Sequence, residues 1–341
     1  MIDKKTVFVL GAGASCPYGY PSGARLRKRI TMGEEFVHDY DIWKIQSKCT
    51  PAYETQKISE FRTVFDKSHV SSIDKFIANN PTLAPIGKYI IAFEIFRHEK
   101  LSFFTEAEKF ELERQANAHN GQFGLQRPAI FSQGDDWYSD LYNRLIGKRV
   151  GKDALPDFSK SNLTFITFNY DRSLEYFFYV SLRNTFTEVS KEIIVDTIKQ
   201  LKIIHVYGQI APLKWQNPQD GIDYRPAITD NLLLNTANKI RTIHELNTEL
   251  TEAQKLLKQA EQIFFLGFGY AKENMDILGL PLIVPKSCSI YGTASGLLEG
   301  EIYNKKTILA HPDELGKIPP RLPTRIIIDD MDCLKLLRNY L

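Results

Sequence analysis

A glycine-rich segment follows the first apolar run of this chain, at a point where a strand is expected to end. The run is Thr6–Leu10, and the five residues after it read Gly-Ala-Gly-Ala-Ser. Glycines after a strand allow a tight turn, and backbone N–H groups at the start of the next helix can bind the pyrophosphate of a nucleotide. The candidates for this phosphate anchor are Gly11, Ala12, Gly13, Ala14 and Ser15.

Two polar residues follow the second apolar run, Leu163–Thr167, and flank Tyr170. Because alternate residues of an extended chain point the same way, Asn169 and Asp171 are expected in one cleft. There Asn169 could hold a ribose or orient a water molecule, and Asp171 could contact the ribose or orient a neighbour. Tyr170 could cover a base or belong to the core. Asn and Asp are also favoured helix N-caps, so a purely structural role stays open for both.

A histidine follows the third run, Lys202–Ile204. An imidazole titrates near neutral pH, so His205 could accept a proton from water or from a ribose hydroxyl. A histidine beside apolar residues can instead be hydrogen-bonded inside a core. Gly208 lets a ligand approach closely, and the position at a strand end matches that of the other polar segments. Both features favour a place for His205 in the cleft.

The fourth and fifth runs, Ile263–Leu266 and Ser289–Tyr291, also end in small residues. Phe268 lies between two glycines and could cover a base, although an aromatic residue beside a strand is often core. The remaining residues are candidates for the adenosine half of the cleft, with close packing as the alternative. They are Gly267, Gly269, Gly292, Thr293 and Ser295.

Strand ends of this kind are typical of open parallel α/β sheets, in which ligands bind outside the carboxyl ends of the strands. We predict one domain over residues 1–341, with a Rossmann-like, doubly wound parallel sheet. Apolar spacing predicts a large helical insertion at about 25–160, a loop or small insertion at about 209–240, and a long helix near 243–263. Residues 120–134 are predicted to form a loop.

Helix starts are predicted after Ser22 and Ser72, and near Asp136, because these residue types cap helix N-termini. The stretch from Ala84 to His119 is predicted to form one or two further helices. A final strand and helix are expected after Thr324.

Composition narrows the function classes. The net charge of +2, with 43% apolar and 25% charged residues, is that of an ordinary globular protein and gives no reason to expect nucleic-acid or membrane binding. No apolar stretch has the length of a signal peptide or of a membrane span, so a cytoplasmic location is expected. The four cysteines form no C-x-x-C pair, which predicts reduced thiols and no metal.

Two common nucleotide-binding classes are disfavoured. The third glycine of the dehydrogenase fingerprint would fall at Cys16, and no strand precedes the acidic residues at about the required distance. The chain also lacks the G-x-x-x-x-G-K-[ST] motif of P-loop enzymes.

The segments that begin at Gly11, Asn169, His205 and Gly267 resemble, in this order, those of the sirtuin-like superfamily over nearly the whole chain. Three further segments resemble the bacterial branch used in antiphage defence: Pro21-Ser22-Gly23, Ser72-Ile73-Asp74 and Tyr291-Gly292-Thr293-Ala294-Ser295. This resemblance implies an NAD⁺ glycohydrolase that cleaves the nicotinamide–ribose bond and depletes NAD⁺ in abortive infection. By position, Asn169 and His205 match the catalytic asparagine and histidine of that family.

The chemistry of that reaction fits the candidate residues. Cleavage passes through an oxocarbenium-like ribose, so the site must anchor the pyrophosphate, position the ribose and activate water or a hydroxyl group. An NAD⁺-dependent deacylase or ADP-ribosyltransferase is an alternative, but sirtuin deacylases carry a four-cysteine zinc module that this chain lacks. A non-catalytic NAD⁺ or ADP-ribose binding module is another alternative, in which Asn169 and His205 would be replaceable.

An enzyme that destroys NAD⁺ needs a gate, because unregulated activity would kill the host. We therefore expect a homo-oligomer or a partner subunit. Partners in the resembling family include HerA-type ATPases and short Argonaute proteins, and a HerA-type ATPase suits a stand-alone chain better. The helical insertion between Arg25 and Leu145 is the candidate interface, although it could simply cover the cleft.

Overall fold

The computed structural model describes residues 2–32, 44, 52–118, 136–147, 155–242, 245, 248–310 and 325–341. Six parallel strands form one sheet in the order β3-β2-β1-β4-β5-β6. The strands are β1 (Thr6–Leu10), β2 (Leu163–Thr167), β3 (Lys202–His205), β4 (Gln262–Leu266), β5 (Ser289–Thr293) and β6 (Ile326–Asp329). This is a Rossmann-like, doubly wound α/β fold, as predicted. Because the strand order reverses between β1 and β4, a crevice is expected at their carboxyl ends.

A row of aromatic side chains holds the central strands in register. Phe8 of β1 lies opposite Phe165 of β2 and Phe264 of β4, and its ring centroid is 5.3 Å from each of theirs. Tyr291 of β5 extends the row, 4.8 Å from Phe264. Such ring pairs contribute stabilisation beyond the burial of apolar area, so they stabilise the strands that border the crevice.

Helices cover the sheet and follow its strands. They are α7 (Trp137–Ile146), α8 (Ser173–Thr185), α9 (Lys191–Lys199), α11 (Thr248–Leu257), α12 (Lys272–Ile277), α13 (Glu299–Ala310) and α14 (Cys333–Tyr340). Helix α14 packs on β5 and α7, while α11 packs on β3 and α13 on β6. No helix within the described ranges combines the length and apolar character needed to cross a membrane.

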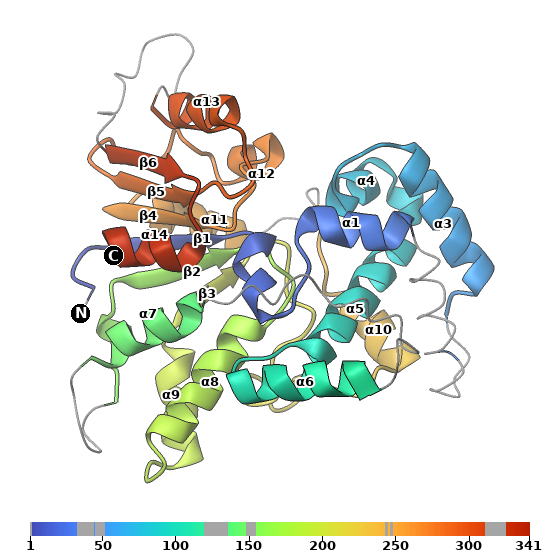
Figure 1. Cartoon of the computed structure of the whole chain (residues 1–341), viewed down its shortest axis with the longest axis horizontal. Helices are drawn as coiled ribbons and strands as arrows, with labels where there is room; N and C mark the ends of the chain where they lie inside the picture. The colour runs from blue at the N-terminus through green and yellow to red at the C-terminus, as the bar shows by residue number, and fades with distance from the viewer. Residues whose placement is uncertain are drawn as a thin grey trace.

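The described residues between β1 and β2 form helices and turns and no strand, as predicted. The longer helices are α1 (Gly23–Thr31), α3 (Thr55–Lys67), α4 (Ile73–Asn79), α5 (Ala84–Leu101) and α6 (Glu106–Ala118). The predicted caps are confirmed: the side chains of Ser22, Ser72 and Asp136 accept backbone hydrogen bonds at the starts of α1, α4 and α7. Figure 1 shows α1, α3, α4 and α5 beyond the carboxyl ends of the strands.

A buried ion pair fastens this helical region to the sheet. Arg172, which follows β2, and Glu99 of α5 are both fully buried, with two N–O distances of 2.9 Å between them. The guanidinium also donates to the carbonyl oxygens of Ile222 and Asp223, each at 2.7 Å. Arg172 therefore joins the sheet, α5 and the segment after β3 at one point.

Three details differ from the sequence predictions. Helix α11 ends at Leu257 and β4 begins at Gln262, so the helix predicted near 243–263 is shorter; Ile243 and Leu246 lie outside the described residues. The segment 209–240 contains the helix α10 (Asp230–Ala237). Strand β5 runs on to Thr293, so Gly292 lies within the sheet and not after it. The predicted loop at 120–134 is outside the described residues.

Candidate functional site

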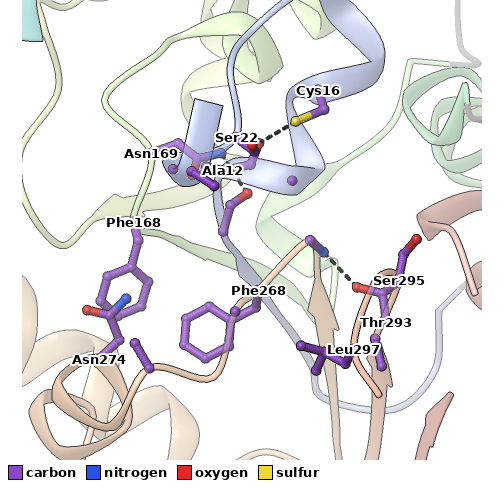
Figure 2. A pocket seen from close by; sticks show the side chains of 18 of the residues that line it. Ala12, Cys16, Ser22, Phe168, Asn169, Phe268, Asn274, Thr293, Ser295 and Leu297 are labelled. Atoms are coloured by element: carbon purple, nitrogen blue, oxygen red, sulfur yellow. Dashed lines mark hydrogen bonds between the residues drawn. The ribbon is translucent and has the colours of Figure 1, made fainter. Parts of the chain in front are cut away.

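A cavity of about 1140 Å³ lies at the carboxyl ends of β1, β4 and β5. Figure 2 shows Ala12 and Phe268, from the loops after β1 and β4, together with Ser295 and Leu297, which follow β5. Much of the predicted site lines this cavity: Gly11, Ala12, Gly13, Asn169, Gly267, Phe268, Gly269, Thr293 and Ser295. Other predicted residues lie outside the described lining: Ala14, Ser15, Tyr170, Asp171, His205 and Gly292. The sequence therefore predicted where the cavity lies, but not which of these residues line it.

The loops after β1 and β4 touch backbone to backbone. A Cβ atom added to Gly11 would lie 2.5 Å from the carbonyl oxygen of Gly267, and Gly13 N donates to that same oxygen at 3.0 Å. Gly267 has a φ of 55° and no room for a side chain. Close packing, the alternative left open for such glycines, is therefore confirmed here. Gly269 differs, because a Cβ atom there would meet nothing within 4 Å.

Close packing also limits the predicted phosphate anchor. The N–H groups of Gly11, Gly13, Ala14 and Ser15 all donate to backbone carbonyl oxygens. Among the described residues, only the N–H of Ala12 in this segment has no acceptor. The five-residue anchor predicted from sequence is thus reduced to one available donor.

The N-terminus of α1 supplies donors that the sequence analysis did not assign. Ser22, Gly23 and Ala24 line the cavity. Ser22 Oγ accepts from Arg25 N, whereas the N–H groups of Gly23 and Ala24 have no acceptor within the described part of the chain. These N–H groups and the positive end of the helix dipole favour an anion. The cap signal at Ser22 marked this helix start but not its direction toward the cleft.

Asn169 is the polar side chain of the β2 end that reaches the cavity. It is 8% exposed, and its Nδ2 group donates to Gly11 O and to Ser15 Oγ, each at 3.0 Å. Both protons of the amide are thereby used. Its Oδ1 atom is buried and has no partner among the described residues. A buried acceptor without a donor is costly, so this oxygen is expected to meet a hydrogen-bond donor from a ligand or from water.

Asp171 lies outside the described lining of the cavity and precedes Arg172, the N-cap of α8. Its Oδ1 atom accepts from Ser173 N at 3.1 Å and from the Ser173 hydroxyl. Burial raises the pKa of Asp171, and hydrogen bonds from Ser173 and Ser15 oppose that shift. The structural alternative is therefore the one that its contacts support.

His205 is held at both ring nitrogens. Nδ1 lies 2.9 Å from the carbonyl oxygen of Asn169, and Nε2 lies 2.8 Å from Glu175 Oε1. Burial alone would lower the pKa of His205, but the Glu175 carboxylate and the two hydrogen bonds raise it above its usual value. Because a carbonyl and a carboxylate both accept, the imidazolium that donates twice fits best. Gln209 Nε2 lies 3.2 Å from His205 Nε2, so a general-base role for His205 would require these contacts to open.

Sequence reasoning also left side chains on the opposite wall without a role. Tyr207 lines the cavity, and its hydroxyl donates to Asn274 Oδ1 at 2.8 Å. Asp74 of α4 lines it too and accepts from the Tyr170 hydroxyl. Tyr207 lies two residues after the histidine that was selected, and Asp74 stands in a segment noted for a helix start and for its resemblance. Their chemical types were visible, but not their place in one cavity.

Comparisons with protein-family models, curated proteins and solved structures find no match to this chain. Within the described ranges, no group of three or more His, Cys, Asp or Glu residues is placed to hold a metal ion. The geometry of the cavity is therefore the basis for a functional assignment.

Proposed function

We propose that this protein is an NAD⁺ glycohydrolase that cleaves the bond between nicotinamide and ribose. The single observation that carries the proposal is the buried, unpartnered Oδ1 of Asn169, a residue that lines a cavity at the switch point of a doubly wound sheet. The resemblance to sirtuin-like defence proteins points to the same residue.

The cavity suits a dinucleotide in size and polarity. Ligand clefts commonly measure about 300–1000 Å³, and this one measures about 1140 Å³. The N–H groups of Gly23 and Ala24 at the start of α1 are placed for a diphosphate. Phe168 and Phe268, whose ring centroids are 5.4 Å apart, give the wall an apolar surface for a base.

Hydrolysis of this bond needs little general-acid catalysis by the protein. When the C–N bond breaks, its electron pair neutralises the positively charged pyridinium, so nicotinamide leaves without protonation. The ribose becomes cationic, and water adds to it and passes one proton to the solvent. Asn169 Oδ1 can accept from that water or from a ribose hydroxyl as charge develops. His205 contributes through its hydrogen bond to Asn169 O, which makes it a positioning residue.

A non-catalytic NAD⁺ or ADP-ribose binding module is the second candidate, and one observation favours it. Both ring nitrogens of His205 are engaged, so the base expected from sequence is occupied. A binding module needs the cavity and the donors of α1 but no proton acceptor.

The biological setting follows from the resemblance. We expect a cytoplasmic protein of antiphage defence whose activity is gated by homo-oligomerisation or by a HerA-type ATPase. The helical region from α1 to α7 is the candidate interface. An isolated monomer with full activity would remove the reason for such a gate.

The direct test is nicotinamide release from NAD⁺ by the purified chain, alone and with a HerA-type ATPase. Asn169→Ala should abolish release while ADP-ribose still binds. Asn274→Ala is the matched control, since it removes another amide from the cavity wall and should leave release largely intact. Binding of NAD⁺ without release in every condition would favour the binding module.

A further inference from the structure

The helical region places a carboxylate inside the cavity. Asp74 is the second residue of α4, and Ser72, the N-cap of that helix, accepts from Asp74 N at 3.2 Å. Asp74 is half-buried and lines the cavity with Ser72 and Lys75. The chain segment that brings it there lies far from β2 in sequence, and only the fold makes this group and Asn169 line the same cavity.

Neutral donors hold the carboxylate. The Tyr170 hydroxyl donates to Oδ1, and the Ser72 hydroxyl donates to Oδ2 at 3.0 Å. Tyr170 directly follows Asn169, so the same turn after β2 carries the orphan amide oxygen and orients Asp74. A carboxylate has about four acceptor positions, so these two bonds leave acceptor capacity for a ligand.

The other carboxylates on the cavity wall are occupied by cations. Glu273 pairs with Lys75, and Asp332 caps α14 while it pairs with Lys335 Nζ at 3.2 Å. Within the described part of the chain, Asp74 forms no such ion pair. Its carboxyl group therefore lies beside the cavity without a cationic partner among the described residues, and burial raises its pKa, while the hydrogen bonds from Tyr170 and Ser72 oppose that shift.

We propose that Asp74 accepts hydrogen bonds from the hydroxyl groups of the ribose on the nicotinamide side of the bound dinucleotide. A vicinal diol offers two donors, which matches the free acceptor capacity of this carboxylate. The nicotinamide side is assigned because Tyr170 ties Asp74 to the turn that carries Asn169. A negative charge there also stabilises a ribose that becomes cationic. The inference deepens the proposed function and rests on it.

Two stable nucleotides test the contact without any turnover. ADP-ribose carries the ribose in question and ADP lacks it, so the ratio of their dissociation constants isolates that sugar. Hydrogen bonds to a charged group contribute about 1.5–3 kcal/mol, so the wild-type chain should bind ADP-ribose about tenfold or more tightly than ADP. Asp74→Asn, which keeps an acceptor for Tyr170, should remove most of this preference and leave ADP affinity unchanged.

Glu273→Gln is the matched control, because it removes a carboxylate from the same wall and should keep the preference. Tyr170→Phe provides a second variant that leaves Asp74 in place but frees it from its donor, and we expect a smaller loss of preference. Equal wild-type affinity for the two nucleotides would overturn the proposal without any variant. So would a folded Asp74→Asn protein that still prefers ADP-ribose as strongly as the wild type.

Nicotinamide release, measured on the same proteins, separates this inference from the proposed function. Release by a wild type whose ADP-ribose preference is independent of Asp74 would overturn only the role of Asp74. An Asp74-dependent preference without release in any condition would overturn hydrolysis and leave the ribose contact standing. Failure to bind either nucleotide would overturn both.

Discussion

The two sides of the turn after β2 differ in how many of their polar atoms have hydrogen-bond partners. On the cavity side, Asn169 keeps an oxygen without a donor and Asp74 keeps acceptor capacity. On the buried side, Asp171 Oδ1 accepts from the backbone N–H and the hydroxyl of Ser173, and His205 lies between the Asn169 carbonyl oxygen and Glu175. Polar residues of the same types thus line the cavity on one side and bond within the fold on the other. Unfilled hydrogen-bonding capacity, more than residue type, marks the site.

The largest effect is expected from a substitution on the cavity side of the turn. Loss of one preorganised polar group that stabilises a transition state costs about 10²–10³ in rate. Asn169→Ala should therefore lower the rate constant for nicotinamide release by that factor, while the affinity for ADP-ribose changes by less than about tenfold. Quenched time courses of nicotinamide release measure the rate constant, and calorimetric titration measures the affinity for ADP-ribose. A rate close to that of the wild type would remove Asn169 from the reaction.

The next largest effect is expected from a substitution on the buried side of the turn. Asp171→Ala removes the side-chain acceptor of the Ser173 N–H at the start of α8, and loss of a comparable contact at an N-cap costs about 0.5–2 kcal/mol. We expect a lower midpoint of thermal unfolding and a rate per folded molecule within a few-fold of the wild type. A rate loss as large as that of Asn169→Ala, in a protein of unchanged stability, would place Asp171 on the cavity side.

A pH dependence of stability sharpens the comparison at His205. The pKa of this imidazole is raised in the fold, despite burial, by Glu175 and by two hydrogen bonds. Its contribution is therefore fully present below the ordinary pKa of 6.5 and is lost as the pH rises through the higher value of the folded state. Urea unfolding from acid to alkaline pH should show this decline, and His205→Gln should flatten it. A decline that persists in the variant would belong to other groups.

The smallest effect concerns the rim of the cavity. The ion pair between Lys75 of α4 and Glu273 of α12 joins two walls but is largely exposed, and such pairs contribute about 0–1 kcal/mol. Lys75→Met should change ADP-ribose affinity by less than about fivefold and lose its effect at high salt. A change of a hundredfold, insensitive to salt, would show that this pair holds the cavity in shape.

The strands were predictable because burial imposes a simple pattern on them. β1 and β2 begin and end at the predicted residues, and the capping serines located α1 and α4. β5 was expected to stop at Tyr291, but Gly292 stays within β5 and gives room to the Tyr270 hydroxyl. A local pattern cannot show which neighbour fills the space above a glycine.

The candidate site was predictable in position and not in detail. The ends of parallel strands share an edge, which was enough to place Asn169 and Phe268 in one cavity. The fate of His205 depended on Glu175, a helix residue whose sequence context gave no sign of burial. The role of Asp74 depended on a contact across the fold with Tyr170. Hydrogen bonds between distant segments leave no periodic trace in a sequence.

The buried pair of Arg172 and Glu99 limits how far this chain can be shortened. If the region around α5 were deleted, the guanidinium would lose its carboxylate inside an apolar interior, and breaking such a pair costs about 3–5 kcal/mol. The sheet and the helices beside it are therefore not separable modules. A minimal version of this protein trimmed to its six strands would lose solubility, and a calorimetric scan of the intact chain should show one cooperative transition.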